Sequence, residues 1–203
     1  MQLTGLFSRG TPEFHEVEPI LDAALDVFAD IGVRRATVDE VAKRAGLGRV
    51  TVYRKLGGKN EILSAVLIRE SQRLFDKVRA AAPPDEAFED RVVHAFATTV
   101  WTVRSNKVWN RLLQLESASI LENLTVNASG VLAGAVQATA DVLRGPDMPL
   151  DDQGLLARAE ILVRITHSIL LTPHVLLELD DYDAVEDFAR RYLLPIAAGT
   201  PGS

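Results

Sequence analysis

The sequence contains no cysteine in its 203 residues. This absence excludes disulfide bonds, thiolate nucleophiles and cysteine-ligated zinc, and it is typical of proteins that work in the reducing cytoplasm. Histidine is scarce as well, because only four occur and none shows a metal-binding spacing such as H-E-x-x-H. We therefore expect a cytoplasmic protein that holds neither a metal ion nor a cofactor.

Long uninterrupted apolar runs are also missing. The most apolar segment, residues 161–177, is broken by two histidines, Arg164 and Pro173, so it predicts a buried helix rather than a membrane span. The first residues lack a basic region followed by a long apolar stretch, and we expect no signal peptide there. Apolar residues nevertheless make up 47% of the chain, which is enough to build a globular core.

Strand-like alternation of apolar and polar residues does not persist anywhere, whereas apolar residues recur at helical spacing throughout the chain. The expected fold is all-α, with about nine helices in two parts and a boundary inside the long fourth helix. The helices are expected at residues 17–33, 36–46, 49–56, 59–82, 85–105, 107–121, 125–145, 152–172 and from residue 179 onward.

Positive charge is concentrated in one short region of an otherwise acidic chain. The formal net charge is −6, yet residues 33–59 carry eight Lys or Arg side chains against two acidic ones. From residue 81 onward the balance reverses, with nine basic and seventeen acidic side chains. Such a local patch is typical of a nucleic-acid-binding module attached to a part with another task.

The basic region holds two short helices joined by a tight turn. Thr37 and Glu40 have the spacing of a capping box that starts the first helix, and Gly46 ends it. The second helix covers residues 49–56. This is the helix-turn-helix pattern, in which the second helix lies in the DNA major groove, so the pattern accounts for the local positive charge. Val52, on the apolar side of that helix, is expected in the core.

Residues 20–63 resemble the N-terminal domain of TetR-family transcriptional regulators. Their sequence is ILDAALDVFADIGVRRATVDEVAKRAGLGRVTVYRKLGGKNEIL. The family pattern runs from an amphipathic helix and a glycine turn through T-x-x-x-V/I-A-x-x-A-G to Y-x-x-F and a lysine that opens the fourth helix. The corresponding residues here are Gly32, Thr37, Val41, Ala42, Ala45, Gly46, Tyr53, Leu56 and Lys59.

Three positions depart from this pattern. Gly48 stands where the family usually has a Ser or Thr cap, and glycine still caps a helix, slightly less well. Val50 replaces a small residue near the DNA, and we expect it to contact a thymine methyl group. Leu56 replaces an aromatic residue. Beyond these three positions, Gly57-Gly58 replaces a more polar turn. These differences leave the expected fold intact and bear on the operator sequence that would be read.

The resemblance implies which side chains would meet DNA. Thr37 would contact a phosphate, Tyr53 would touch the backbone, and Lys59 would hold a phosphate at the start of the fourth helix. The whole expected set is Arg35, Thr37, Arg49, Val50, Thr51, Tyr53, Arg54, Lys55 and Lys59, of which Arg49, Val50 and Thr51 would face bases. The DNA-binding domain would span residues 15–62, after a flexible N-terminus of residues 1–14. Arg34 and Arg35 would each lie either against DNA or in solvent.

Family members bind a small molecule in their larger helical part, which the resemblance assigns here to residues 63–203. The expected ligand-binding residues are His94, Phe96, Thr98, Trp101, Arg104, Trp109, Leu112 and Glu116. Because apolar side chains prevail among them, a lipophilic effector such as an acyl chain or an aromatic compound is expected. The same aromatic residues would serve equally well as ordinary core, and His94 as a hydrogen-bonded core histidine.

The resemblance also implies a homodimer. In this family the last two helices of each subunit pair across a two-fold axis as a four-helix bundle. The expected interface residues are Ile161, Ile165, Ser168, Leu171, Phe188, Tyr192 and Ile196. Two recognition helices one DNA turn apart then require a roughly palindromic operator in double-stranded DNA.

Two other classes of function stay open at this point. An enzyme is disfavoured because the sequence has no G-x-S-x-G, P-loop or G-x-G-x-x-G motif. A helical adaptor that binds protein would carry the basic patch incidentally and would show no salt-dependent DNA binding. The sequence does not separate an activator from a repressor that its effector releases, and the repressor is the working hypothesis.

Overall fold

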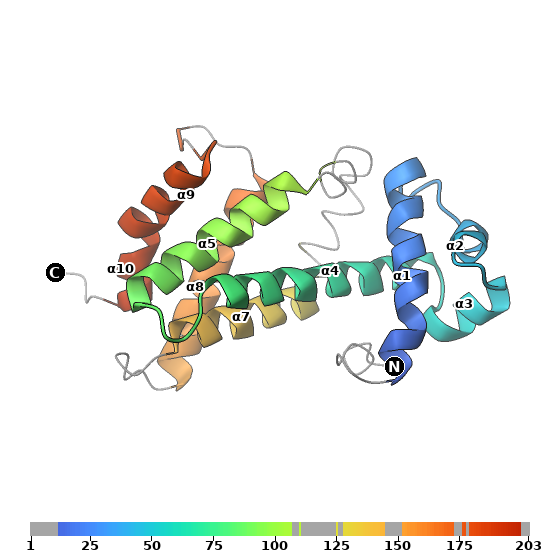
Figure 1. Ribbon diagram of the computed structural model, residues 1–203, viewed down its shortest axis with the longest axis horizontal. Helices are drawn as coiled ribbons and strands as arrows, with labels where there is room; N and C mark the ends of the chain where they lie inside the picture. The colour runs from blue at the N-terminus through green and yellow to red at the C-terminus, as the bar shows by residue number, and fades with distance from the viewer. Residues whose placement is uncertain are drawn as a thin grey trace. The chain divides into compact units, whose positions relative to one another are not determined.

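The computed structural model describes residues 12–106, 110, 125, 128–144, 152–172, 176–177 and 179–199. The regular elements among these residues are all helical, which confirms the expected all-α class (Figure 1). The chain divides into two compact units, one of Met1–Ser71 with Lys107–Val131 and one of Gln72–Asn106 with Leu132–Ser203. The described part contains no helix that is long and apolar enough to cross a membrane.

The first unit is built on α1 (Pro12–Ile31), with α2 (Val38–Arg44) and α3 (Arg49–Leu56) packed beside it (Figure 1). Apolar residues spaced three and four apart on these helices and on the start of α4 (Lys59–Ala81) form one core. Its fully buried members include Ile20, Leu21, Ala24, Phe28, Val52, Ile62 and Ala65. Removing their apolar surface from water is the main force that holds these helices together.

Helix α1 begins at Pro12, five residues before the start that periodicity predicted. Proline is tolerated in the first turn of a helix, where its missing N–H would have no intrahelical partner. The expected flexible N-terminus is therefore too long at residues 12–14, and its residues 1–11 lie outside the described residues.

The second unit is a bundle of α5 (Phe88–Ser105), α7 (Ser129–Leu143), α8 (Asp152–Leu171) and a C-terminal helical run. Its core joins buried side chains of α5 and α8 to those of the C-terminal run. Buried Arg91 on α5 donates from Nε to the Val142 carbonyl at 3.1 Å and from Nη1 to the Glu86 carbonyl at 2.8 Å. It thereby satisfies a carbonyl group at the C-terminal end of α7 that has no helical partner.

The C-terminal run was expected to be one helix, and it contains a change of helical type. It consists of α9 (Tyr182–Phe188), a π-helical turn (Ala189–Leu193) and α10 (Leu194–Ala198). Pro195 explains the change, because it lacks an N–H and its ring clashes with the carbonyl four residues earlier. The N–H of Leu194 donates instead to the Ala189 carbonyl five residues back, as in a π-bulge.

Candidate nucleic-acid interface

The turn between α2 and α3 fixes the direction of the candidate recognition helix. Gly46 adopts φ +69°, a left-handed conformation that favours glycine, and directly after it the Leu47 N–H donates to the Ala42 carbonyl at 2.9 Å. Gly48 then precedes α3 in an extended conformation without a side-chain cap. The turn therefore ends α2 and starts α3 within four residues, as the sequence predicted.

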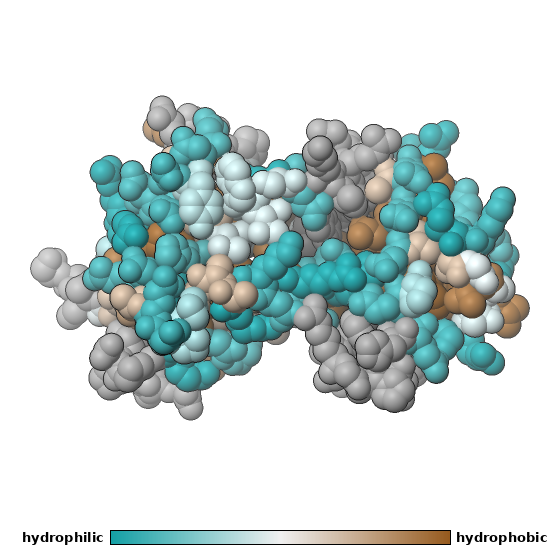
Figure 2. Space-filling model, viewed as in Figure 1, coloured by the Kyte–Doolittle hydropathy of each residue, from teal (hydrophilic) through white to brown (hydrophobic). Residues whose placement is uncertain are grey.

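Helix α3 has one buried and one exposed face. Val52 is fully buried and Leu56 nearly so, which confirms Val52 as a core residue. On the other face Val50 is 79% exposed and Tyr53 is 60% exposed. Figure 2 shows hydrophobic residues reaching the surface at the α3 end of this unit among hydrophilic neighbours. Large apolar side chains so exposed on a short helix are typical of a contact surface rather than of core.

Thr37 is the N-cap of α2. The Glu40 N–H donates to Thr37 Oγ1 at 3.2 Å, and the Thr37 N–H donates to Glu40 Oε2 at 2.8 Å, so the predicted capping box is confirmed. The Thr37 hydroxyl also donates to Glu40 Oε2 at 2.9 Å. Its proton is therefore already used within the cap. The contact of Thr37 with a phosphate stays a prediction, and it requires that hydroxyl to rotate.

Three of the expected DNA-binding cations have partners within this unit. Arg49 Nη1 donates to Asp39 Oδ2 at 3.1 Å, and the Lys55 ammonium pairs with Glu16. Lys59 Nζ donates to the carbonyl of Arg34 at 3.0 Å, which ties the start of α4 to the turn after α1. Each contact is at the surface, where ion pairs are worth little. DNA phosphates can therefore compete with the present partners of Lys55 and Lys59.

Two further cations are unengaged in the described structure. Arg35 and Arg54 are exposed, and their side chains make no ion pair or hydrogen bond with any described residue. Thr51 is half-buried in the first turn of the candidate recognition helix. The expected DNA-binding residues thus belong to α3, to the segment that leads into α2 and to the start of α4. Their roles toward DNA remain predictions.

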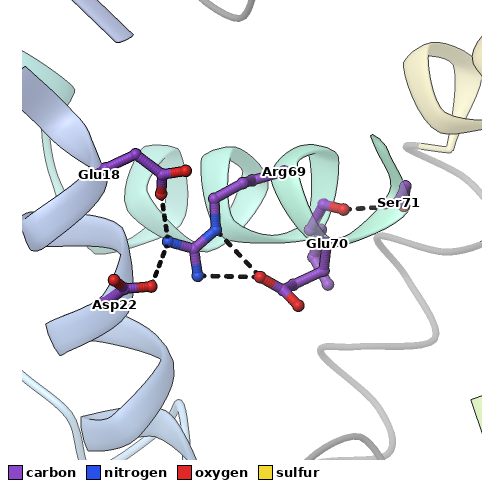
Figure 3. Close-up of polar contacts among 6 residues, drawn as sticks. Glu18, Asp22, Arg69, Glu70 and Ser71 are labelled. Carbon is purple, nitrogen blue, oxygen red and sulfur yellow. Dashed lines mark hydrogen bonds and ion pairs between the residues drawn. The ribbon is translucent and has the colours of Figure 1, made fainter. Parts of the chain in front are cut away.

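A charged cluster that the sequence did not reveal joins α1 to α4. Arg69 is only 1% exposed, and Figure 3 shows its guanidinium among Glu18, Asp22 and Glu70. Nη1 donates to Glu18 Oε2 at 2.9 Å and to Asp22 Oδ1 at 2.8 Å, while Nε donates to Glu70 Oε1 at 3.0 Å. The sequence offered one signal, since Arg69 follows Ile62 by seven residues on the apolar stripe of α4.

The pair of Lys55 and Glu16 carries the one resolved electrostatic shift at this interface. The Lys55 ammonium hydrogen-bonds the Glu16 carboxylate and lowers the pKa of that carboxyl below its ordinary value of 4.5, by the hydrogen bond first and by charge attraction second. The Glu16 side chain is 62% exposed, so the pair is screened by solvent. Its effect is to hold α3 against α1 in a way that weakens in acid.

The expected ligand-binding residues that the structure describes in the second unit have different surroundings. Phe96 is buried and stacks on Phe188 with ring centroids 5.7 Å apart, whereas Trp101 is largely exposed and meets Tyr182 edge-on at 6.1 Å. The guanidinium of Arg104 donates to the carbonyl of Leu179. Thr98 is half-buried on α5. Trp109, Leu112 and Glu116 lie outside the described residues.

His94 lies between two carboxylates. Its Nδ1 is 3.0 Å from Glu86 Oε1, and its Nε2 is 3.6 Å from Glu186 Oε1. The imidazole thereby links α5 to the preceding loop and to α9. This arrangement matches the alternative of a histidine engaged within the fold, because both ring nitrogens already face partners.

A pocket of about 320 Å³ lies elsewhere in this unit, between α7 and α8. Its lining is mainly apolar and consists of Leu132, Ala133, Val136, Gln137, Leu156, Glu160, Val163 and Arg164. None of these residues was expected to bind a ligand. The available signal was the run of small residues in α7, which leaves room beside a neighbouring helix.

The expected dimer residues differ in their surroundings. Ile161 is 48% exposed and Tyr192 is 51% exposed, and Ser168 is also at the surface. Ile165, Phe188 and Ile196 pack partly against the core of their own chain, and Leu171 is half-buried. The single chain does not test the interface, so the dimer stays a prediction.

The sequence of the first unit matches a known protein family. The sequence pattern of "Bacterial regulatory proteins, tetR family" matches residues 20–66. The HTH-type transcriptional regulator SrpR of Pseudomonas putida is 35% identical over 115 residues, which cover 54% of this chain and 52% of SrpR, about half its length. The uncharacterized HTH-type transcriptional regulator TtgW of the same species is 35% identical over 54% of this chain and 83% of its own.

The fold has counterparts among solved structures. The TetR family repressor AlkX from Dietzia sp. superposes with a TM-score of 0.67 over 94% of this chain and 99% of its own, at 19% sequence identity. The likeness covers both units and shows that the helical fold is shared.

Proposed function

Because the chain belongs to the tetR family of bacterial regulatory proteins, we propose that it is a transcriptional regulator that binds double-stranded DNA through α3. The observation that carries this proposal is the two-sided character of α3. Val52 and Leu56 anchor the helix in the core, while Val50 and Tyr53 stand exposed beside Arg49 and Arg54. Apolar and cationic side chains together can read base edges and hold phosphates.

The regulator is proposed to act as a homodimer on a palindromic operator. Supporting this, α8 and the C-terminal run expose Ile161 and Tyr192, two large side chains that a monomer gains nothing by leaving in water. A two-fold pair of subunits presents two copies of α3, and each would occupy a major groove one helical turn from the other.

A small, lipophilic effector is proposed to control DNA binding, with repression relieved when it binds. The candidate residues around Trp101 on α5 and the apolar pocket between α7 and α8 are two locations for it. Control requires that the effector bind the DNA-competent and DNA-incompetent states with different affinity. Helix α4, which begins with the candidate phosphate contact Lys59 and continues into the second unit, is the element proposed to shift between the states.

Other functions receive less support. The matched relatives carry the names of transcriptional regulators rather than of enzymes or protein-binding adaptors. A cytoplasmic location, without metal or cofactor, belongs to the proposal. An activator would use the same interface as a repressor.

Selection from a random library of DNA duplexes tests the proposal, with the full chain as bait and sequencing of the bound pool. The expected result is a two-fold symmetric motif whose half-sites are centred about 10 base pairs apart. Recovery of duplexes without any shared motif would contradict it.

A further inference from the structure

The ion pair between Arg49 and Asp39 joins the first residue of α3 to the first turn of α2. Arg49 Nη1 lies 3.1 Å from Asp39 Oδ2, and the side chains are 65% and 61% exposed. Surface pairs of this kind contribute little to folding, since water solvates both charges well. Folding stability therefore does not account for this pair.

The start of α3 runs against the usual rules for helix stability. Gly48 gives no side-chain cap, and the first turn has no acidic residue but begins with the cation Arg49. A positive charge there opposes the helix dipole. Positions that break a local rule in this way are expected at functional sites. Asp39 is the side chain from a neighbouring helix that brings negative charge to this helix end.

Asp39 is not needed to close the cap of α2. Thr37 and Glu40 complete that capping box by themselves. The Asp39 carboxylate is therefore available to Arg49. A guanidinium has five N–H donors, and one of them is given to Asp39 in this pair. Bidentate recognition of guanine uses two others, on O6 and N7. Arg49 can thus keep Asp39 and read a guanine at the same time.

We propose that Asp39 is a positioning residue that sets the base specificity of Arg49, an inference that rests on the proposed DNA-binding function. By holding the guanidinium, Asp39 reduces the conformational freedom that Arg49 would lose on binding a base. It also adds a negative charge next to the DNA, which disfavours phosphate contacts by a misplaced Arg49. Asp39 therefore favours duplexes that present guanine to Arg49 over all others.

The test compares variants of the full chain on duplexes chosen by wild-type selection from the random library. Fluorescence anisotropy measures binding to the selected duplex, to single-base-pair variants of it and to a scrambled duplex. The affinity ratio between the selected duplex and a single-base-pair variant measures discrimination. Arg49→Ala is expected to lower this ratio roughly 5- to 150-fold at one base pair of each half-site, which is the range that one bidentate contact accounts for. Asp39→Ala and Asp39→Asn are expected to lose about threefold or more at that same base pair and to bind scrambled DNA more tightly.

A double variant separates positioning from general electrostatics. If Asp39 acts through Arg49, then Asp39→Ala changes discrimination no further in the Arg49→Ala background. The matched control is Asp30→Asn. It alters a similarly exposed pair, in which Asp30 Oδ2 lies 2.9 Å from Arg44 Nη2 and which joins α1 to α2 without a residue of α3. It is expected to keep wild-type discrimination. Thermal melting of every variant establishes that the losses do not reflect unfolding.

Several results would overturn the inference. Asp39→Ala could change affinity for all duplexes by one common factor, or its effect on discrimination could persist without Arg49. Unchanged base preference in Arg49→Ala would also refute it, while leaving the proposed function intact. If the wild-type chain enriches no motif, the proposed function itself is refuted, and this result does not depend on any Asp39 variant.

Discussion

Val50 and Val52 stand two residues apart on α3, and the first is 79% exposed whereas the second is fully buried. The two valines therefore have different roles on one helix. Val52 holds the helix in the three-helix core, and Val50 is free for a partner. This pair offers a matched comparison, because one chemical change can be made at both sites.

Replacing each valine by alanine should separate stability from recognition. Val52→Ala removes two buried methyl groups and is expected to lower the free energy of unfolding by about 2 kcal/mol. Val50→Ala should change it by less than about 0.5 kcal/mol, as is usual for surface sites. It should instead weaken binding to the selected duplex. Urea denaturation and anisotropy measure the two effects, and equal destabilisation by both substitutions would contradict this account of α3.

The buried charge cluster should be important for stability. Arg69→Ala leaves Glu18, Asp22 and Glu70 without their shared cation, which is expected to cost about 3 kcal/mol of unfolding free energy. The estimate is at the low end for buried pairs because Asp22 is exposed to solvent. Arg44→Ala is the control, since Arg44 forms only exposed pairs and its loss should cost less than about 1 kcal/mol. Similar losses in urea denaturation would show that burial of Arg69 does not matter.

The contact between Lys55 and Glu16 should stabilise the first unit in a pH-dependent way. Because the folded-state pKa of Glu16 is lowered, its contribution is present above the ordinary carboxyl pKa of 4.5 and is lost as the pH falls through the folded value. Glu16→Gln should therefore melt at a slightly lower temperature than wild type at pH 7. The difference should disappear in acid, and a difference that grows on acidification would contradict the assignment.

The exposed side chains of α8 should matter for assembly. Sedimentation of the wild-type chain at micromolar concentration is expected to show a dimer, and Ile161→Glu should dissociate it by placing a charge in an apolar interface. The control is Leu177→Glu, because Leu177 is similarly exposed and lies outside the proposed interface. A monomeric wild type would refute the dimer, and dissociation by both variants would refute this choice of interface.

Binding of a lipophilic effector should be visible in tryptophan fluorescence, since Trp101 and Trp109 are the only tryptophans. Medium-chain fatty acids and small aromatic compounds are suitable probes. A probe that binds should shift the emission and weaken binding to the selected duplex, and Trp101→Phe should reduce that response. An unchanged response would exclude Trp101 from the site. Tight binding that leaves DNA affinity constant would refute the proposed switch.

Local chemistry explains what was predictable in this fold. Thr37 and Glu40 lie three residues apart and close the capping box by themselves, and Gly46 ends α2 through its own left-handed conformation. Both signals are contained in a few neighbouring residues. The buried faces of α1 and α3 followed from periodicity for the same reason, since helical spacing decides which residues share a side.

Features that depend on distant residues were missed. Arg69 meets Asp22, 47 positions away, and His94 meets Glu186 across the bundle, so neither pairing has a local signal. The π-helical turn arises because the Pro195 ring would clash with the carbonyl four residues earlier in a regular α-helix. The pocket between α7 and α8 depends on how closely two helices pack, which composition alone does not give.

The affinity ratio between specific and random DNA tests the central claim most directly. Anisotropy titrations with the selected duplex and with a scrambled duplex of equal composition, at several salt concentrations, measure it in the full chain. We predict binding that weakens steeply with salt and favours the selected duplex by roughly a thousandfold or more. Equal affinity for both duplexes would contradict the claim that α3 reads a DNA sequence.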